Sequence, residues 1–211
     1  MLLGHFAVGM AAKRAAPRVS LGWLFVAAQT LDLIWPVLIL AGVEHVRLVP
    51  GITQVNALDL YDMPYSHSLA TALLWSLLFA GLYLALERDR RGAAVLGAVV
   101  FSHWVLDFIA HRPDMQLWPG NPQRYGLGLW SSRPATIAGE VGMFLAGGWL
   151  YWQATAGKRR RGVWILFGVL LAVGIGSSFG PVPPNTTALA VSALVILPVA
   201  VLAGWLERPR A

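Results

Sequence analysis

Cysteine is absent from the 211-residue sequence, and charged residues are scarce. Without cysteine, the chain can form neither disulfides nor thiolate metal sites. Only 12% of the residues are charged while 57% are hydrophobic, a balance outside the range of soluble globular domains and typical of polytopic membrane proteins. The apolar start, residues 1–12, has no basic segment before it, so we expect it to stay in the mature protein and not to act as a signal peptide.

Apolar runs predict an all-α fold, a transmembrane helical bundle that forms one integral membrane domain over residues 1–211. Residues 1–12 would make a helix of about 18 Å, too short to cross a bilayer, and we expect a half-membrane or interfacial helix there. Six later runs are long enough for full spans, namely 21–43, 66–86, 92–110, 135–154, 162–179 and 185–206. The last three spans therefore occupy 135–206.

Basic residues predict the orientation of the bundle in the bacterial inner membrane. Short segments between spans contain 12 of the 16 Lys and Arg residues, and alternation of the spans puts them all on one side, which the positive-inside rule makes cytoplasmic. These segments are 13–18, 88–91, 158–161 and 208–210. The long loops 44–65 and 112–133 would then face outward. This distribution also argues against nucleic acid as the partner of a chain with a net charge of +6.

Histidine and carboxylate residues recur within the predicted spans, where ionisable groups are costly and usually functional. His103, Asp107 and His111 are spaced four and four, so they lie on one face of a helix. Counting residues from the nearest basic turn places several others in the same outer half of the bilayer or at its edge, namely His5, Asp32, His67 and Glu140. Imidazole and carboxylate suit zinc, manganese or iron.

We therefore predict a divalent-metal site. Its ligands would be Asp32, His67, His103 and Asp107, with His5 and His111 as further candidates. A structural polar network and a proton or ion pathway are the alternatives that these residues leave open.

A resemblance extends this interpretation. The order His5, Asp32, Ser66-His67-Ser68 and His103-x3-Asp107 resembles a family of bacterial inner-membrane proteins described as metal-dependent hydrolases. That family is similar to zinc-dependent phospholipase C and the S1/P1 nucleases. The resemblance covers about residues 1–115 and implies one zinc held by Asp32, His67, His103 and Asp107, with His5 sharing Asp107 with another. The sequence has no downstream His-x3-Glu pair to go with Glu140, so a full trinuclear site is not expected.

The resemblance implies a hydrolase, such as a phosphoesterase, acting on lipid or lipid-linked phosphate at the outer leaflet. Asp107 or Glu140 would accept the proton of the attacking water, and Arg112 and Arg133 would hold a phosphate. Two other classes remain open, an ion- or proton-coupled transporter and a non-catalytic subunit of a larger membrane complex. The expected partners are membrane lipid, other membrane proteins or a second copy of the chain.

Overall fold

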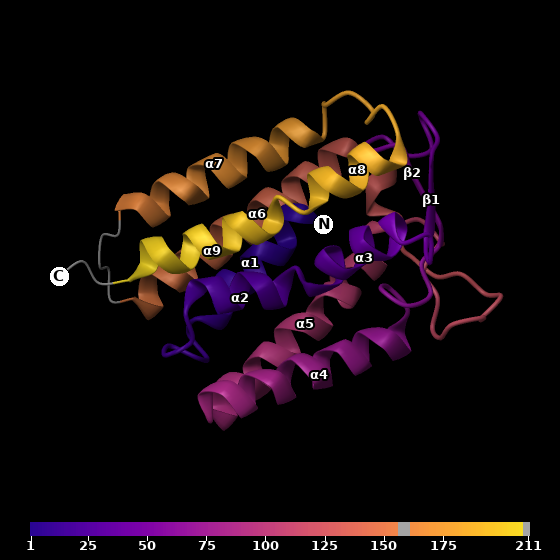
Figure 1. Ribbon diagram of the computed structural model, residues 1–211. Coiled ribbons are helices and arrows are strands. Elements are labelled where there is room, and N and C mark those ends of the chain that lie inside the picture. Colours follow the sequence, from indigo (N-terminus) through magenta and orange to yellow (C-terminus); the bar gives the residue numbers. More distant parts are fainter. Residues whose placement is uncertain (156–160, 209–211) are drawn as a thin grey trace.

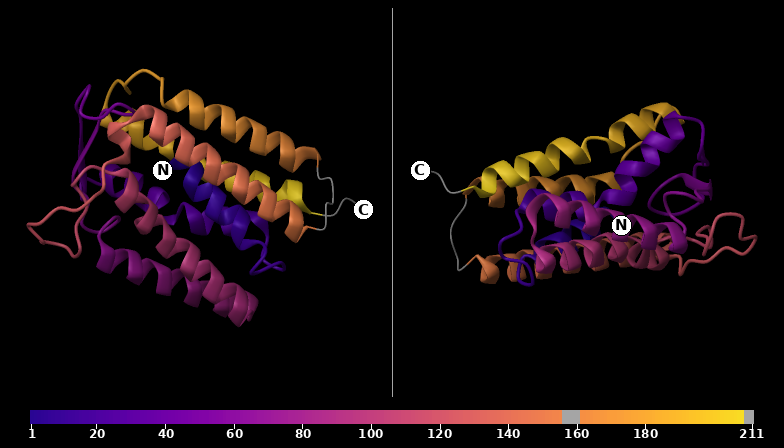
Figure 2. Two further views of the ribbon diagram at one scale, coloured as in Figure 1. Left: turned by 180° about the vertical axis from the view of Figure 1, so that it is seen from behind. Right: turned by 60° about the horizontal axis from the view of Figure 1, so that its bottom comes forward.

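A computed structural model describes residues 1–155 and 161–208, and within them the chain is mostly helical. The elements, in chain order, are α1 (Leu2–Ala12), α2 (Leu21–Ala28), α3 (Thr30–Leu40), β1 (His45–Leu48), β2 (Leu58–Asp62), α4 (Leu69–Glu87), α5 (Arg90–Ala110), the 3-10 helix η1 (Leu129–Ser131), α6 (Arg133–Ala154), α7 (Arg161–Ser177), α8 (Thr186–Ala193) and α9 (Ile196–Glu207). The helices form an elongated bundle. The hairpin β1–β2 and the loop before η1 lie at one end, which we call the loop end (Figures 1 and 2).

Three helical segments are long and apolar enough to cross a membrane: Leu69–Glu87, Arg90–Ala110 and Thr186–Glu207. A fourth span is possible if α2 and α3 count as one, although they meet at an angle of 54°. These agree with four of the predicted runs. The prediction of six full spans is not supported, because α7 has only 17 residues and the glycines, tryptophans and Glu140 of α6 keep its hydropathy low.

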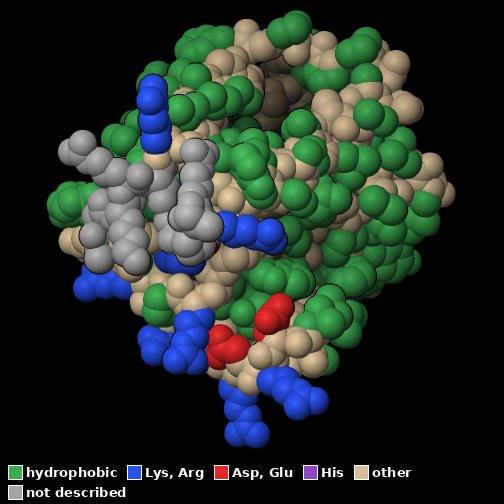
Figure 3. Space-filling model, turned by 60° about the vertical axis from the view of Figure 1, so that its left-hand side comes forward, with side chains coloured by type: hydrophobic (Ala, Val, Ile, Leu, Met, Phe, Trp, Pro, Cys, Tyr) green, Lys and Arg blue, Asp and Glu red, His purple; other side chains and the backbone are tan. Residues whose placement is uncertain are grey.

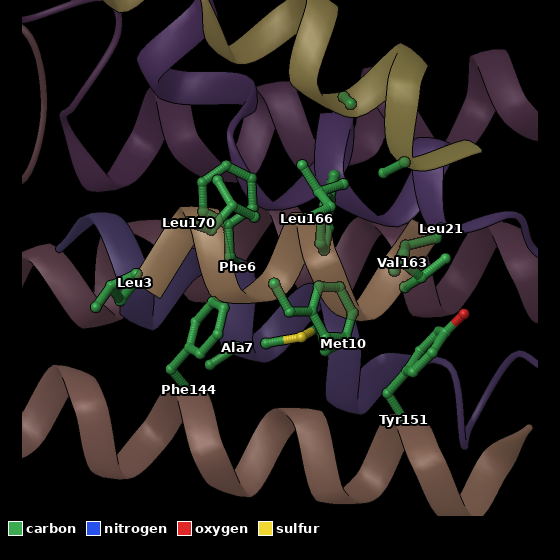
Figure 4. Packing of buried hydrophobic residues seen from close by; sticks show 14 residues of the cluster. Leu3, Phe6, Ala7, Met10, Leu21, Phe144, Tyr151, Val163, Leu166 and Leu170 are labelled. Carbon is green, nitrogen blue, oxygen red and sulfur yellow. The ribbon is translucent and has the colours of Figure 1, made fainter. Parts of the chain in front are cut away.

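Helix α1 lies inside the bundle, where it packs mainly against α6 and also against α2, α5 and α7. Its apolar side chains Leu3, Phe6 and Met10 enter a hydrophobic core. Phe144 of α6 and Leu166 of α7 help to complete this core (Figure 4). The close contact with α6 requires a glycine, since a Cβ on Gly147 would come within 2.5 Å of the Ala7 carbonyl oxygen. The short first helix is thus a central element, and its neighbours cover nearly all of its residues.

The predicted outer loops have structure of their own. Strands β1 and β2 pair antiparallel with a bulge between His45 and Arg47. An ion pair between Arg112 and Asp59 connects the second long loop to this hairpin. Helix α4 begins with Ser68 as its N-cap, since the Ser68 side chain accepts a hydrogen bond from the Thr71 amide.

Most of the basic segments end up together at the opposite end of the bundle, where α1, α4 and α9 end and α2, α5 and α7 begin (Figure 1). We call it the basic end. Of the predicted basic segment 158–161, only Arg161 lies within the described residues. The two sets of loops are therefore separated along the bundle, while the side of the membrane that each faces stays a prediction.

Candidate metal centre

Five side chains from four regions of the chain converge near the loop end of the bundle. We call His5, Asp32, His67, His103 and Asp107 the His/Asp cluster. Among the described residues it contains two groupings whose ligand atoms all lie within 4.8 Å of one another: His5, His103 and Asp107, and Asp32, His67 and His103. The four residues predicted as one ligand set therefore lie together, with His5 beside them.

Local structure explains how each side chain reaches the cluster. On α5 the spacing of four residues brings His103 Nε2 within 3.0 Å of Asp107 Oδ2. The break at Gln29, which separates α2 from α3, turns the first residues of α3 so that Asp32 Oδ1 lies 3.7 Å from His103 Nε2. His67 comes from the segment just before α4, and its Nε2 lies 3.6 Å from both Asp32 Oδ1 and Asp107 Oδ2.

Each cluster imidazole on the Asp32 side is held through its Nδ1 atom. His103 Nδ1 donates to the Ala28 carbonyl at 2.8 Å, the last residue of α2 before the break. His67 Nδ1 lies 2.7 Å from Ser66 Oγ, and Ser66 Oγ donates to the buried Glu44 carboxylate at 2.6 Å. Because the hydroxyl proton is directed to Glu44, Ser66 Oγ is the acceptor for His67 Nδ1–H. Both rings thus turn Nε2 toward the cluster, and a neutral ring that donates through Nδ1 has its Nε2 free to bind a metal, the arrangement that second-shell partners give to metal-binding histidines.

The Asp107 carboxylate connects the two groupings. Its Oδ2 faces His67 and His103, while its Oδ1 lies 3.1 Å from His5 Nε2 and 3.0 Å from the amine of Met1. His111 Nε2 is further away, 3.7 Å from the same Oδ1, and its Nδ1 donates to Asp114 Oδ1 at 3.1 Å. His111 is therefore next to the cluster but outside both groupings.

The donor set fits a divalent metal. Two carboxylates and neutral imidazoles are ligands that zinc uses. Among the described residues, His103 Nε2 is buried and faces Asp107 and Asp32 oxygens at 3.0 and 3.7 Å without a hydrogen bond of its own. A buried imidazole nitrogen that faces carboxylate oxygens without a hydrogen bond is costly unless an ion or ligand satisfies it. The cluster thus has the ligand types of a metal site and a ligand nitrogen that is not used in a hydrogen bond.

The other predicted site residues have different surroundings. Glu140 Oε2 accepts a hydrogen bond from the Leu3 amide at 2.7 Å, so it holds the first turn of α1. Arg112 is paired with Asp59, and its Nε lies 3.6 Å from Asp114. The Arg133 guanidinium lies 5.1 Å from the centre of the Phe179 ring. Their predicted roles in proton transfer and phosphate binding stay predictions.

Glu44, Ser66 and Asp114 are positioning residues that the sequence did not single out for this role. Glu44 is buried, and it accepts hydrogen bonds from the Tyr65 and Ser66 amides as well as the Ser66 hydroxyl. The only sequence feature that pointed to this positioning role was the serine directly before His67.

A cavity of about 360 Å³ opens beside the cluster. Asp32, His67, Asp107 and His111 form one part of its wall, and the rest is largely apolar, with Trp35, Leu60, Met63, Trp130, Leu189 and Ile196. Five of these apolar residues come from α3, β2, η1, α8 and α9, and Met63 directly follows β2. The cluster is therefore accessible from a cavity suited to a hydrocarbon chain.

Comparison with known proteins places the chain in a family. A family model described as YdjM inner membrane protein matches residues 1–182, a range that contains the whole His/Asp cluster. No curated protein and no solved structure matches the chain.

Proposed function

This chain belongs to the YdjM inner membrane protein family, and we propose that it is a membrane-embedded, metal-dependent hydrolase of a lipid or lipid-linked phosphate. One observation carries the proposal: two imidazoles anchored through Nδ1 converge with two carboxylates, and three of these four groups, Asp32, His67 and Asp107, line an apolar cavity. A structural network of polar residues does not require such a cavity, whereas an enzyme needs substrate access to its reactive groups.

Asp32, His67, His103 and Asp107 would hold the ion, and zinc is the one we expect. When bound, such an ion polarises a phosphoryl oxygen and lowers the pKa of a coordinated water. His5 lies within reach of the Asp107 oxygen on the far side of the carboxylate, so it extends the donor set. Asp107, whose Oδ1 faces His5 and the Met1 amine on the side away from His67 and His103, would accept the proton of an attacking water.

The surroundings of the cluster support a lipid substrate. The apolar wall would hold an acyl or isoprenoid chain next to the ligand residues. A second cavity, of about 630 Å³, shares Leu58, Ser177 and Leu189 with the first and is also lined by Arg133. Arg133 would therefore hold the anionic part of the substrate, and it suits that role better than Arg112, whose guanidinium is already paired with Asp59.

The proposal is tested with purified, zinc-loaded protein and a panel of phospholipids and polyprenyl phosphates. We expect phosphate release by the wild type, and its loss in His103→Ala. His45→Ala is the matched control, since His45 is an exposed hairpin residue paired with Asp62. Absence of turnover on every member of the panel, or equal activity in His103→Ala and the wild type, would overturn the proposal.

One observation favours a second candidate, a non-catalytic subunit in which the cluster only stabilises the bundle. Asp107 Oδ1 already has close partners within the chain, the Met1 amine and His5 Nε2. In that case His103→Ala would mainly lower the melting temperature, because it leaves buried polar groups without partners. A large melting shift without any measurable turnover by the wild type would favour this candidate over the enzyme.

A further inference from the structure

A groove between α2 and α9 at the basic end has no part in the proposed hydrolase. It has a volume of about 650 Å³. The two helices come very close along its floor, where a Cβ on Gly22 would lie 2.9 Å from the Ala200 carbonyl oxygen and 3.1 Å from the Cα of Gly204. Val26 and Val201 line the groove along the helices, and Val201 is 65% exposed.

The mouth of the groove carries unbalanced positive charge. Lys13 and Glu207 also line it, but Lys13 Nζ and Glu207 Oε1 form a buried ion pair of 2.8 Å. The Leu21 amide and the Tyr151 hydroxyl donate to the same carboxylate at 2.6 and 3.1 Å. Arg18 and Arg208 are exposed, and neither forms an ion pair within the part of the chain that the structure describes.

Two tryptophans mark the depth of the groove in the membrane. Trp23 and Trp205 both line it, and Trp205 is 60% exposed. Tryptophan concentrates at the headgroup level of a bilayer, and α9 belongs to a candidate span. The arginines therefore lie where lipid phosphates are found, while the valines lie deeper, beside acyl chains. Figure 3 looks onto this end and shows Lys and Arg side chains on its left and lower parts, with two acidic side chains among the lower ones, beside a largely hydrophobic surface.

We propose that this groove binds an anionic phospholipid, with its phosphate between Arg18 and Arg208 and an acyl chain along Val26 and Val201. Basic pockets between membrane helices recognise anionic headgroups in this way. The Lys13–Glu207 pair removes Glu207, the only acidic side chain among the described residues that line the groove, from competition for the arginines. A soluble phosphate would use the arginines but not the apolar part. The proposal is independent of the hydrolase, because the groove lies at the other end of the bundle.

Native mass spectrometry of the full chain tests the site by titration with phosphatidylglycerol and with phosphatidylcholine. We expect the wild type to bind phosphatidylglycerol about tenfold more tightly, a preference that Arg18→Gln/Arg208→Gln removes. Arg90→Gln/Arg91→Gln is the matched control: it removes the same charge from the same end, but from a neighbouring cavity that shares only Arg18 with the groove, so the preference should remain. Inorganic phosphate should not displace the lipid.

Three results would overturn the proposal. They are equal affinity of the wild type for the two lipids, displacement of the lipid by inorganic phosphate, and an equal loss of the lipid preference in the control variant. The last of these would indicate diffuse attraction to the basic end. Melting temperatures in phosphatidylcholine check that the variants fold. If the glutamine variant proves unstable, Arg18→Lys/Arg208→Lys replaces it. The lysine variant keeps the charge and should retain most of the preference, and its failure to do so counts against the site.

Discussion

His5 and His103 stack face to face, with ring centroids 3.6 Å apart and planes inclined by only 4°. Each directs its Nε2 to a different oxygen of Asp107, at 3.1 and 3.0 Å. Because His5 belongs to α1 and His103 to α5, the geometry of the cluster depends on how tightly α1 is held. The contacts of α1 with α6 are therefore part of the site.

Gly147→Ala should test that dependence. Its new Cβ would lie within 2.8 Å of both the Ala7 carbonyl oxygen and the Ala7 Cα, so α1 or α6 must shift. We expect a loss of about 1–3 kcal/mol of stability and weaker metal binding through displacement of His5. Thermal unfolding and metal titration measure the two effects.

The control lies on the same helix. A Cβ at Gly142 meets nothing within 4 Å, so Gly142→Ala should stabilise α6 by about 0.5–1 kcal/mol through its lower backbone entropy. Equal melting temperatures for Gly147→Ala and Gly142→Ala would contradict the close α1–α6 contact.

Metal content should depend on His103 and not on His45. His103 is fully buried in both ligand groupings, and its replacement by alanine removes a ligand that they share. We expect protein purified with zinc to retain the metal as wild type or His45→Ala, and to lose most of it as His103→Ala. Elemental analysis after dialysis gives the ratio of metal to protein. A similar ratio of metal to protein in all three proteins would contradict a metal site at His103.

Ser66→Ala should weaken metal binding although Ser66 is not a ligand. The substitution removes the hydroxyl between Glu44 and His67 Nδ1, and loss of such a partner typically costs about 10–100-fold in metal affinity. Competition with a zinc chelator measures the change.

Ser68→Ala provides the comparison within the same tripeptide. It removes the N-cap of α4 and should cost about 1 kcal/mol of stability while leaving metal affinity nearly unchanged. If Ser68→Ala reduces metal affinity as much as Ser66→Ala does, the effect of Ser66 is general loosening of this segment and not orientation of His67.

Orientation in the membrane can be measured by cysteine labelling, since the sequence has no native cysteine. Pro122→Cys lies in the exposed part of the second long loop, and Arg90→Cys lies at the basic end. An impermeant thiol reagent added to intact cells should label position 122 only, because the basic end is expected to face the cytoplasm. Labelling of position 90 without position 122 would show the opposite orientation. Both proposed lipid sites would then be assigned to the opposite leaflets.

Sequence spacing predicted those parts of the site that belong to one helix. His103, Asp107 and His111 share a face of α5 because the helical repeat fixes the directions of residues four apart. Asp32 and His67 were included through estimated depth and through the resemblance, which constrain the position along the membrane normal but not the direction of a side chain. The helical class and the long apolar helices α4 and α5 followed from composition and run length for the same local reason.

The sequence by itself thus determined a helical inner-membrane protein in which ionisable residues gather at one level. Only the tertiary structure decided that α1 is central, that the chain bends at Gln29, and that Glu44 reaches His67 through Ser66. Hydropathy and periodicity report on neighbours along one helix, and these features depend on contacts between segments far apart in the chain. The physical reason is packing: the bend becomes favourable once the Ala28 carbonyl has the His103 imidazole to accept from, and a short helix becomes central once a glycine lets α6 approach it.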